Sequence, residues 1–135
     1  MNTIVLGYDE SDPAKRALER AAELATAFGS KVIVTSVAPM LVGRAGGRVD
    51  PADPPDEHKR ELMHAASFLA ERGIEGDFDL ALADPASHIV ELAEQRGADL
   101  IVVGTHEPSF LERLLGLSVT RKVERKAHCD VLIVH

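Results

Sequence analysis

Four short runs of apolar, β-branched residues constrain the fold more than any other feature of this sequence. The runs do not alternate strictly between polar and apolar residues, so both faces of each are apolar. Strands buried on both faces are typical of a parallel sheet that is covered by helices on each side. The predicted strands span residues 3–8, 31–37, 99–104 and 130–134.

Helical patterns separate these strands. Apolar residues recur at intervals of three and four, which gives each helix one buried stripe. The stripes comprise Leu18, Ala21, Ala22, Ala25 and Phe28 in the first helix, Leu62, Ala65, Ala66 and Leu69 in the second, and Ile89, Leu92 and Ala93 in the third. Asp12 and Asp84, each followed by proline, predict N-caps. We expect the helices to end at three glycines, Gly29, Gly73 and Gly97.

The remaining segments complete a single α/β domain over residues 1–135. Residues 77–82 alternate between polar and apolar, which predicts a fifth strand, near a sheet edge, with one face exposed to solvent. Residues 39–57 are too rich in glycine and proline for a regular element, so we expect a loop there. The repeated order of strand, helix and strand predicts right-handed crossovers and a doubly wound sheet.

Composition and charge argue against several classes of function. The net charge of −7 opposes binding to nucleic acid and to anionic membranes. The best basic cluster, Arg121, Lys122, Arg125 and Lys126, is interpreted as a solvated helix face. No apolar run is long enough to span a bilayer and no signal peptide is evident, so we expect a cytoplasmic protein. The single cysteine, Cys129, is interpreted as a small apolar residue beside the last strand.

The loops at the carboxyl ends of the strands are the first candidates for a ligand site, because neighbouring loops diverge there and leave a crevice. Residues 7–13 follow the first strand, and residues 104–120 follow the strand predicted at 99–104. We expect a ligand to lie between these two loops.

Five segments, in order along the chain, are similar to those of the universal stress protein family. They are residues 4–11, 84–89, 97–106, 114–120 and 128–134. The resemblance covers essentially the whole chain and implies a Rossmann-like, five-stranded parallel sheet with strand order 3-2-1-4-5. It also implies a stress-response module that forms a homodimer through the C-terminal strand. The candidate interface residues are Val131, Leu132, Ile133 and Val134, and an apolar edge strand independently invites such pairing.

The resemblance further implies a nucleotide site. Asp9 matches the acidic residue that contacts the adenosine moiety in nucleotide-binding relatives, and Val37 matches a backbone contact to adenine. Gly104 matches the first glycine of the family's phosphate-binding pattern, Gly-x2-Gly-x9-Gly-[Ser/Thr]. Ser118 and Val119 match its hydroxyl residue and the following position.

Two glycines of that pattern are replaced, by Glu107 and Leu117, and Gly116 stands one residue early. Glycines in such a loop let backbone N–H groups close on phosphate oxygens. A carboxylate within about 4 Å of a triphosphate opposes its binding by about 1 to 4 kcal/mol. We therefore expect no tight ATP binding. An ATP- or AMP-binding sensor and a slow nucleotide hydrolase are the alternatives.

Other constellations are weaker. Ser118 is equally suited to be an N-cap without a ligand, and Arg113 to pair with a neighbouring glutamate. The six histidines lack metal-ligand spacing on one helical turn. His106 could supply a general base beside Asp9, but no nucleophile elbow, P-loop or magnesium-binding carboxylate pair accompanies it. We expect a binding module rather than an enzyme.

Overall fold

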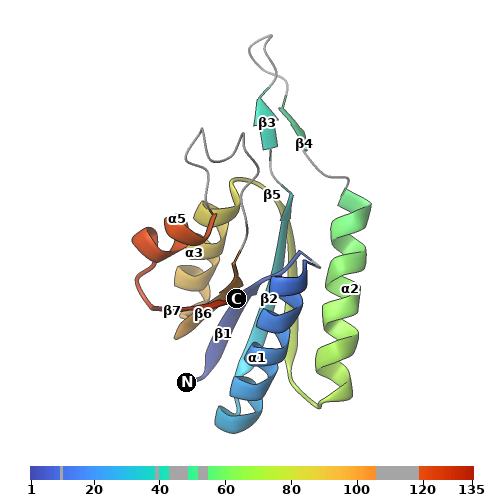
Figure 1. Cartoon of the computed structure of the whole chain (residues 1–135), viewed down its shortest axis with the longest axis vertical. Helices are drawn as coiled ribbons and strands as arrows, with labels where there is room; N and C mark the ends of the chain where they lie inside the picture. The colour runs from blue at the N-terminus through green and yellow to red at the C-terminus, as the bar shows by residue number, and fades with distance from the viewer. Residues whose placement is uncertain (10, 39, 43–48, 52–54, 106–118) are drawn as a thin grey trace.

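A five-stranded parallel sheet forms the centre of the molecule (Figure 1). The computed structural model describes residues 1–9, 11–38, 40–42, 49–51, 55–105 and 119–135. The strands of the sheet are β1 (Thr3–Gly7), β2 (Lys31–Ala38), β5 (Gly76–Leu82), β6 (Leu100–Gly104) and β7 (Asp130–Val134). They lie in the order β5-β2-β1-β6-β7, and each neighbouring pair is parallel. Counted within this sheet the order is 3-2-1-4-5, which confirms the predicted doubly wound fold.

Helices cover both faces of the sheet. One face packs against α1 (Asp12–Phe28) and α2 (Pro55–Glu71), and the other against α3 (Pro85–Arg96) and α5 (Val119–Lys126) (Figure 1). Two apolar layers result, because successive strand residues point to opposite faces. In β1, Ile4 and Leu6 belong to the layer under α1 and α2, whereas Val5 belongs to the layer under α3.

Most of the predicted helix boundaries are confirmed. The Asp84 carboxylate caps α3 by accepting a hydrogen bond from the Ser87 N–H at 3.1 Å. Gly29 and Gly97 end their helices in the left-handed conformation, with φ of 68° and 61°. The predicted cap at Asp12 is wrong by one residue: Ser11 is the N-cap, with its side chain accepting from Ala14 N–H. Asp12 is the first helical residue of α1. Ser11 has an extended backbone, which lets its hydroxyl reach the free N–H of Ala14 in the first turn.

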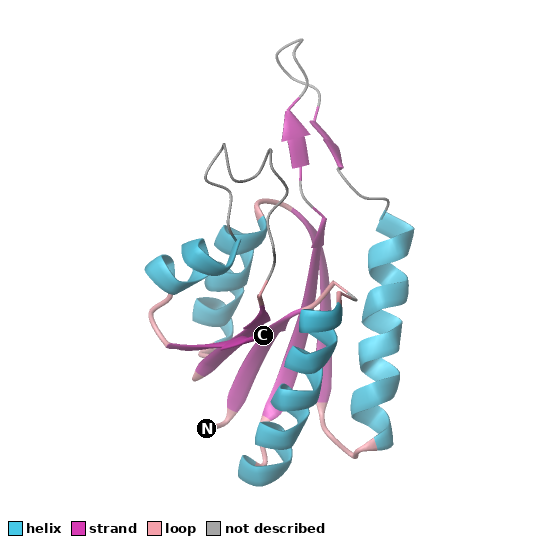
Figure 2. Ribbon diagram, in the orientation of Figure 1, coloured by secondary structure: helices cyan, strands magenta, loops and turns pink. Residues whose placement is uncertain are grey.

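The loop predicted over residues 39–57 contains regular structure. A short antiparallel pair, β3 (Met40–Val42) and β4 (Val49–Pro51), extends beyond the end of β2 (Figure 2). Helix α2 then begins at Pro55. Proline is compatible with both positions, since its missing N–H costs little at a strand end and in the first turn of a helix.

Burial departs from the predicted pattern at two places. Phe28 is 58% exposed, because the buried stripe of α1 ends at Ala25 and the chain turns at Gly29. Strand β5 lies at a sheet edge as predicted, but its apolar side chains are the more exposed ones. Its aspartates, Asp77 and Asp79, are held by hydrogen bonds instead.

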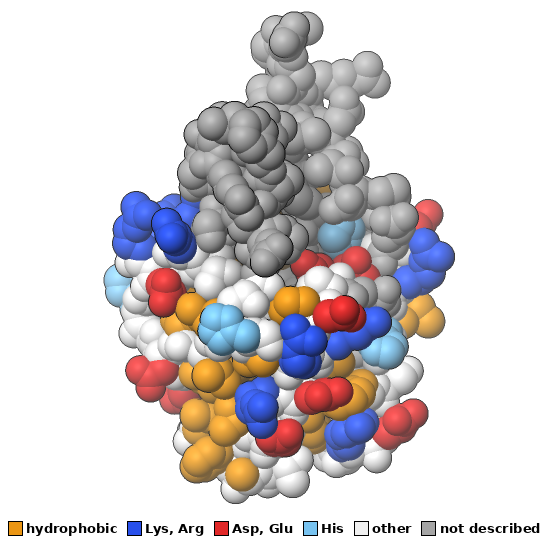
Figure 3. All heavy atoms as spheres, viewed as in Figure 1, with side chains coloured by type: hydrophobic (Ala, Val, Ile, Leu, Met, Phe, Trp, Pro, Cys, Tyr) orange, Lys and Arg blue, Asp and Glu red, His pale blue; other side chains and the backbone are white. Residues whose placement is uncertain are grey.

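The surface carries charges of both signs. The face drawn in Figure 3 shows basic, acidic and hydrophobic side chains interspersed, with basic side chains gathered on α5. Arg121, Arg125 and Lys126 on that helix are exposed, which fits the interpretation of this cluster as a solvated face. Within the described part of the chain, no helix has the length and apolarity needed to cross a bilayer.

Candidate functional site

A cavity of about 280 Å³ opens at the carboxyl ends of β1, β2 and β6. It is called the carboxyl-end cavity below. Its lining consists of Gly7, Tyr8, Asp9, Ser11, Ala14, Thr35, Val37, His58, Pro85, Ile89, Val103, Gly104, Thr105, Val119 and Thr120. Because β1 is followed by α1 on one face and β6 lies beside it, the loops diverge here, as expected at the switch point of a doubly wound sheet.

The cavity brings together four of the residues that the sequence singled out. Asp9, Val37, Gly104 and Val119 all line it. They come from the ends of β1, β2 and β6 and from the start of α5. Their role toward a nucleotide stays a prediction. The other predicted loop positions, Ser118, Glu107, Leu117, Arg113 and His106, lie outside the described residues.

Asp9 and Ser11 form the rim of the cavity at the start of α1. The Ser11 N–H donates to Asp9 Oδ1 at 3.0 Å, while the Ser11 hydroxyl accepts from the Ala14 N–H at 3.2 Å. These two hydrogen bonds hold the exposed Asp9 carboxylate in place beside the N-terminus of α1. An exposed carboxylate held in this way is suited to accept hydrogen bonds from ligand hydroxyl groups.

Gly104 lies where β6 passes the first turn of α1. A Cβ atom at this position would lie 2.6 Å from the carbonyl carbon of Pro13 and 2.7 Å from the Ala14 nitrogen. Only glycine permits so close an approach of two backbones. The narrow gap between β6 and α1 forms one wall of the carboxyl-end cavity.

Strand β2 carries two adjacent hydroxyl residues, Thr35 and Ser36, near its carboxyl end, and their side chains point to opposite faces of the sheet. On the face of α3, the Thr35 hydroxyl donates to Asp79 Oδ2 at 2.7 Å. His88 Nε2 lies 2.6 Å from the same oxygen. Register explains the first bond, because Thr35 and Asp79 are direct neighbours across β2 and β5.

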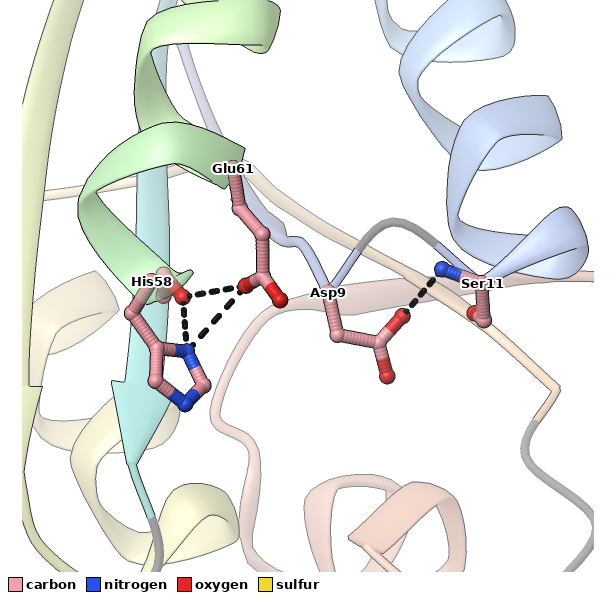
Figure 4. A network of polar contacts seen from close by, with 5 residues as sticks. Asp9, Ser11, His58 and Glu61 are labelled. Carbon is pink, nitrogen blue, oxygen red and sulfur yellow. Dashed lines mark hydrogen bonds and ion pairs between the residues drawn. The ribbon is translucent and has the colours of Figure 1, made fainter. Parts of the chain in front are cut away.

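A second network that also joins a hydroxyl group, a carboxylate and a histidine lies on the face of α2. Ser36 Oγ donates to Glu61 Oε2 at 2.9 Å and lies 2.6 Å from His58 Nδ1. His58 Nδ1 is also 3.1 Å from Glu61 Oε2. Figure 4 shows His58 and Glu61 together on one side of this region, and Asp9 and Ser11 on the other. Buried Ser36 and His58 thereby fix the first turn of α2 against the end of β2.

Tyr8 lies in the loop over residues 7–13 that was expected to hold a ligand, whereas Thr35 and His58 of the cavity were not predicted. Thr35 had a detectable signal, because it precedes Val37 by two residues and therefore shares its face of the strand. His58 was considered only as a metal ligand. Among the described residues, no group of three or more His, Cys, Asp or Glu side chains is arranged to hold a metal ion.

Among the described residues, four titratable groups that do not line the cavity, Asp77, Asp84, Asp99 and Cys129, have shifted pKa values. Burial raises the pKa of the Cys129 thiol, helped by the nearby charges of Asp130 and Asp99. The neutral thiol is therefore favoured, which fits an apolar role for Cys129. Burial alone would raise the pKa of Asp84, but hydrogen bonds from Ser87 outweigh this effect and lower it below its ordinary value.

Comparison with known proteins identifies the family. The profile of the universal stress protein family matches residues 1–135. A universal stress protein of Methanocaldococcus jannaschii is 34% identical, covering 97% of this chain and 80% of the relative. A universal stress protein of Mycobacterium tuberculosis is also 34% identical, covering 98% of this chain and 95% of the relative.

Solved structures agree with these sequence relatives. The crystal structure of a universal stress protein in complex with cAMP has a TM-score of 0.77 and 32% identity, covering 99% of this chain and 96% of the other. A universal stress protein of Archaeoglobus fulgidus in complex with dAMP has a TM-score of 0.72 and 30% identity, and the match covers 100% of this chain and 98% of the other. Because the family profile matches residues 1–135, this chain belongs to the universal stress protein family.

Proposed function

We propose that this protein binds an adenine mononucleotide in the carboxyl-end cavity and acts as a binding and signalling module of the stress response rather than as an enzyme. The observation that carries the proposal is the convergence of Asp9, Val37, Gly104 and Val119 on one cavity. Two family members of at least 30% identity are described in complex with dAMP or cAMP, which supports the same ligand class here.

The size and the walls of the cavity support a mononucleotide. Its volume of about 280 Å³ lies just below the usual range of ligand pockets, roughly 300–1,000 Å³, which favours a small nucleotide over a larger one. Ile89 and Val103 supply apolar surface for a base, and Asp9 supplies an acceptor for ribose hydroxyl groups. Helix α5 begins at Val119, and the N–H groups of a helix N-terminus favour a phosphate group.

We also propose that ATP binds less tightly than AMP. Glu107 and Leu117 replace two glycines of the family's phosphate-binding pattern. The carboxylate opposes additional negative charge, and both side chains restrict the backbone. An ATP-binding sensor remains the second candidate, because the chain retains the first glycine of that pattern, Gly104.

Calorimetric titration of the full chain with AMP, cAMP and ATP tests these proposals. We expect AMP to bind more tightly than ATP, and no hydrolysis product to accumulate. Asp9→Asn keeps an acceptor for the Ser11 N–H but removes the charge, so AMP affinity should fall about tenfold. Asp12→Ala removes an exposed carboxylate that does not line the cavity and serves as the matched control. Wild-type protein that binds neither AMP nor ATP would contradict the proposed function.

The partner that we propose is a second copy of the chain, paired through β7. This strand lies at the edge of the sheet opposite β5, and Val131, Leu132, Ile133 and Val134 are only partly buried. An apolar edge strand with unpaired backbone groups favours association with a second strand. We further propose a cytoplasmic location, since the single cysteine gives the fold no internal disulfide that needs an oxidising compartment.

A further inference from the structure

The edge strand β5 carries a row of exposed apolar side chains. Phe78, Leu80 and Leu82 are 42%, 37% and 43% exposed. They alternate with Asp79, which bonds to His88 of α3, so they point to the other face of the sheet, the face of α2. Edge strands are commonly protected from pairing by a lysine, a proline or a bulge. No lysine or proline interrupts residues 78–82, so this edge is left open to pairing.

The main-chain groups of the same residues point outward. The Val32 N–H of β2 donates to the Glu75 carbonyl oxygen at 3.0 Å. Because main-chain groups alternate in direction along a strand, those of Asp79 also face β2, whereas those of Phe78 and Leu80 face away from it. No strand of the described residues lies beyond β5. The edge therefore offers hydrogen bonds at the positions where it also offers apolar side chains.

Helix α2 forms a wall over this edge. It packs on β2 and β5, whereas α1 packs mainly on β1, β6 and β7 (Figure 1). Phe68 of α2 faces α1, since it lines a surface hollow together with Ala22 of that helix. Met63, Ala66 and Ala70 lie about 140–200° around the helix from Phe68, and therefore on the side of β5. The wall above the edge is thus apolar, and Met63 is 69% exposed.

The size of this surface fits a single added strand better than a second folded domain. The exposed parts of the three β5 side chains and of Met63 add up to a patch on the order of 300 Å². A stable contact between two folded domains buries about 800 Å² on each partner. When an extended peptide adds to a sheet edge, main-chain hydrogen bonds supply the affinity that a small patch lacks, and side chains at alternate positions supply specificity.

We propose that β5 is a docking edge for an extended segment of a partner protein, which adds to the five-stranded sheet as a further strand and is apolar at every second position. Its apolar side chains contact Phe78, Leu80 and Leu82 beneath α2. Its other side chains share the opposite face with Asp77 and Asp79. Those carboxylates already have ion-pair or hydrogen-bond partners, so uncharged polar residues match them. The inference goes beyond the proposed function, because the carboxyl-end cavity takes no part in it.

Fluorescence anisotropy with labelled peptides and the full chain tests the proposal. The first probe is as long as β5, seven residues, and alternates valine with threonine. A second probe of the same composition has its valines grouped at one end, and a third is the first probe methylated on its backbone nitrogens. We expect saturable binding of the first probe alone. No saturation up to about 1 mM, or equal binding of all three probes, would overturn the proposal. The titration contains no nucleotide, so its failure leaves the proposed function standing.

Three variants locate the contact. Leu80→Lys places a charge beneath the added strand and should weaken binding of the first probe at least about tenfold. Leu80→Ile keeps an apolar side chain suited to a strand and should bind as wild type does. Phe28→Lys is the matched control, since Phe28 is 58% exposed but lies at the end of α1, outside β5 and α2, and affinity should not change. Equal affinity of wild type and a Leu80→Lys protein shown to be folded by a thermal melt would contradict the proposal.

Hydrogen exchange followed by NMR on the wild-type protein gives a second readout that needs no variant. The amide protons of Phe78 and Leu80 should exchange faster than that of Asp79, which faces β2, and the first probe should slow them. Protection of β7 in their place would put the peptide on the opposite edge and refute the proposed site. A lower molar mass of Leu80→Lys in light scattering would mean that a second copy of the chain occupies β5, and the proposed occupant would be wrong.

Discussion

Gly104 and Pro13 approach so closely that a Cβ atom on Gly104 would lie 2.6 Å from the carbonyl carbon of Pro13. The neighbouring atoms are all backbone and cannot move aside without shifting α1 or β6. Gly104→Ala should therefore lower the free energy of unfolding by about 1 to 3 kcal/mol, measured by urea denaturation.

Gly7→Ala is the control for this prediction. Its Cβ would meet the end of the Ile89 side chain at 3.0 Å and Val103 at 3.3 Å, and side chains yield more easily than backbone. The loss should be smaller than for Gly104→Ala. Equal stability of the two variants would mean that β6 and α1 are not in close contact in solution.

The Asp84 N-cap of α3 makes the free energy of unfolding depend on pH. Asp84 has a pKa below its ordinary value because hydrogen bonds from Ser87 outweigh the effect of burial. Its charged form therefore contributes stability above the unfolded-state pKa, and this contribution is lost as the pH falls through the lower folded-state value. Denaturant titrations between roughly pH 2 and pH 7 should show the loss below about pH 4.

Two substitutions separate charge from capping at this position. Asp84→Asn preserves an N-cap acceptor, so stability at neutral pH should be nearly unchanged while the acid dependence becomes shallower. Asp84→Ala removes the acceptor and should cost about 1 kcal/mol at neutral pH. An unaltered acid profile in Asp84→Asn would show that other carboxylates account for it.

Restoring the two glycines tests the role of the altered loop. Glu107→Gly with Leu117→Gly removes a negative charge and returns backbone freedom at both positions. ATP affinity should rise by about five- to a thousandfold, whereas AMP affinity should change little. Calorimetry with both nucleotides gives the answer. Unchanged ATP affinity would refute the explanation based on Glu107 and Leu117.

Strand β7 is the proposed dimer contact. A charge in the middle of an apolar edge disfavours pairing with a second strand, so Ile133→Lys should be monomeric in light scattering. Leu80→Lys places the same charge on the opposite edge strand, β5, and should leave the dimer intact. Because Ile133 also packs against the core, both variants need a thermal melt to show that they are folded. A folded Ile133→Lys dimer would place the interface elsewhere.

The fold was predictable from sequence because its signals are local. The apolar runs, the Asp84 cap and the glycines at Gly29 and Gly97 each depend on residues within one turn or one strand. The errors are local as well. At Ser11 and Asp12 two good capping residues compete, and propensity alone does not decide between them.

The polar networks beside the cavity were not predictable in the same way. Thr35 and Asp79 are far apart in the chain and meet only through the register of β2 and β5. Ser36 and Glu61 meet because α2 packs against β2. A side chain's partner across a sheet depends on registry, and a single sequence does not specify registry until the strand order is known.

The central position of β1 has a consequence for how the chain is made. Leu6 lies between Val34 of β2 and Val102 of β6, and the second of these neighbours is roughly a hundred residues away. At a synthesis rate of about 5–20 residues per second, β1 waits on the order of 5–20 s before its second edge can be paired. During that interval an apolar strand with open hydrogen-bonding groups is exposed to other nascent chains. We expect the yield of this protein in a cell to depend on the pace of translation as well as on the stability of the finished fold.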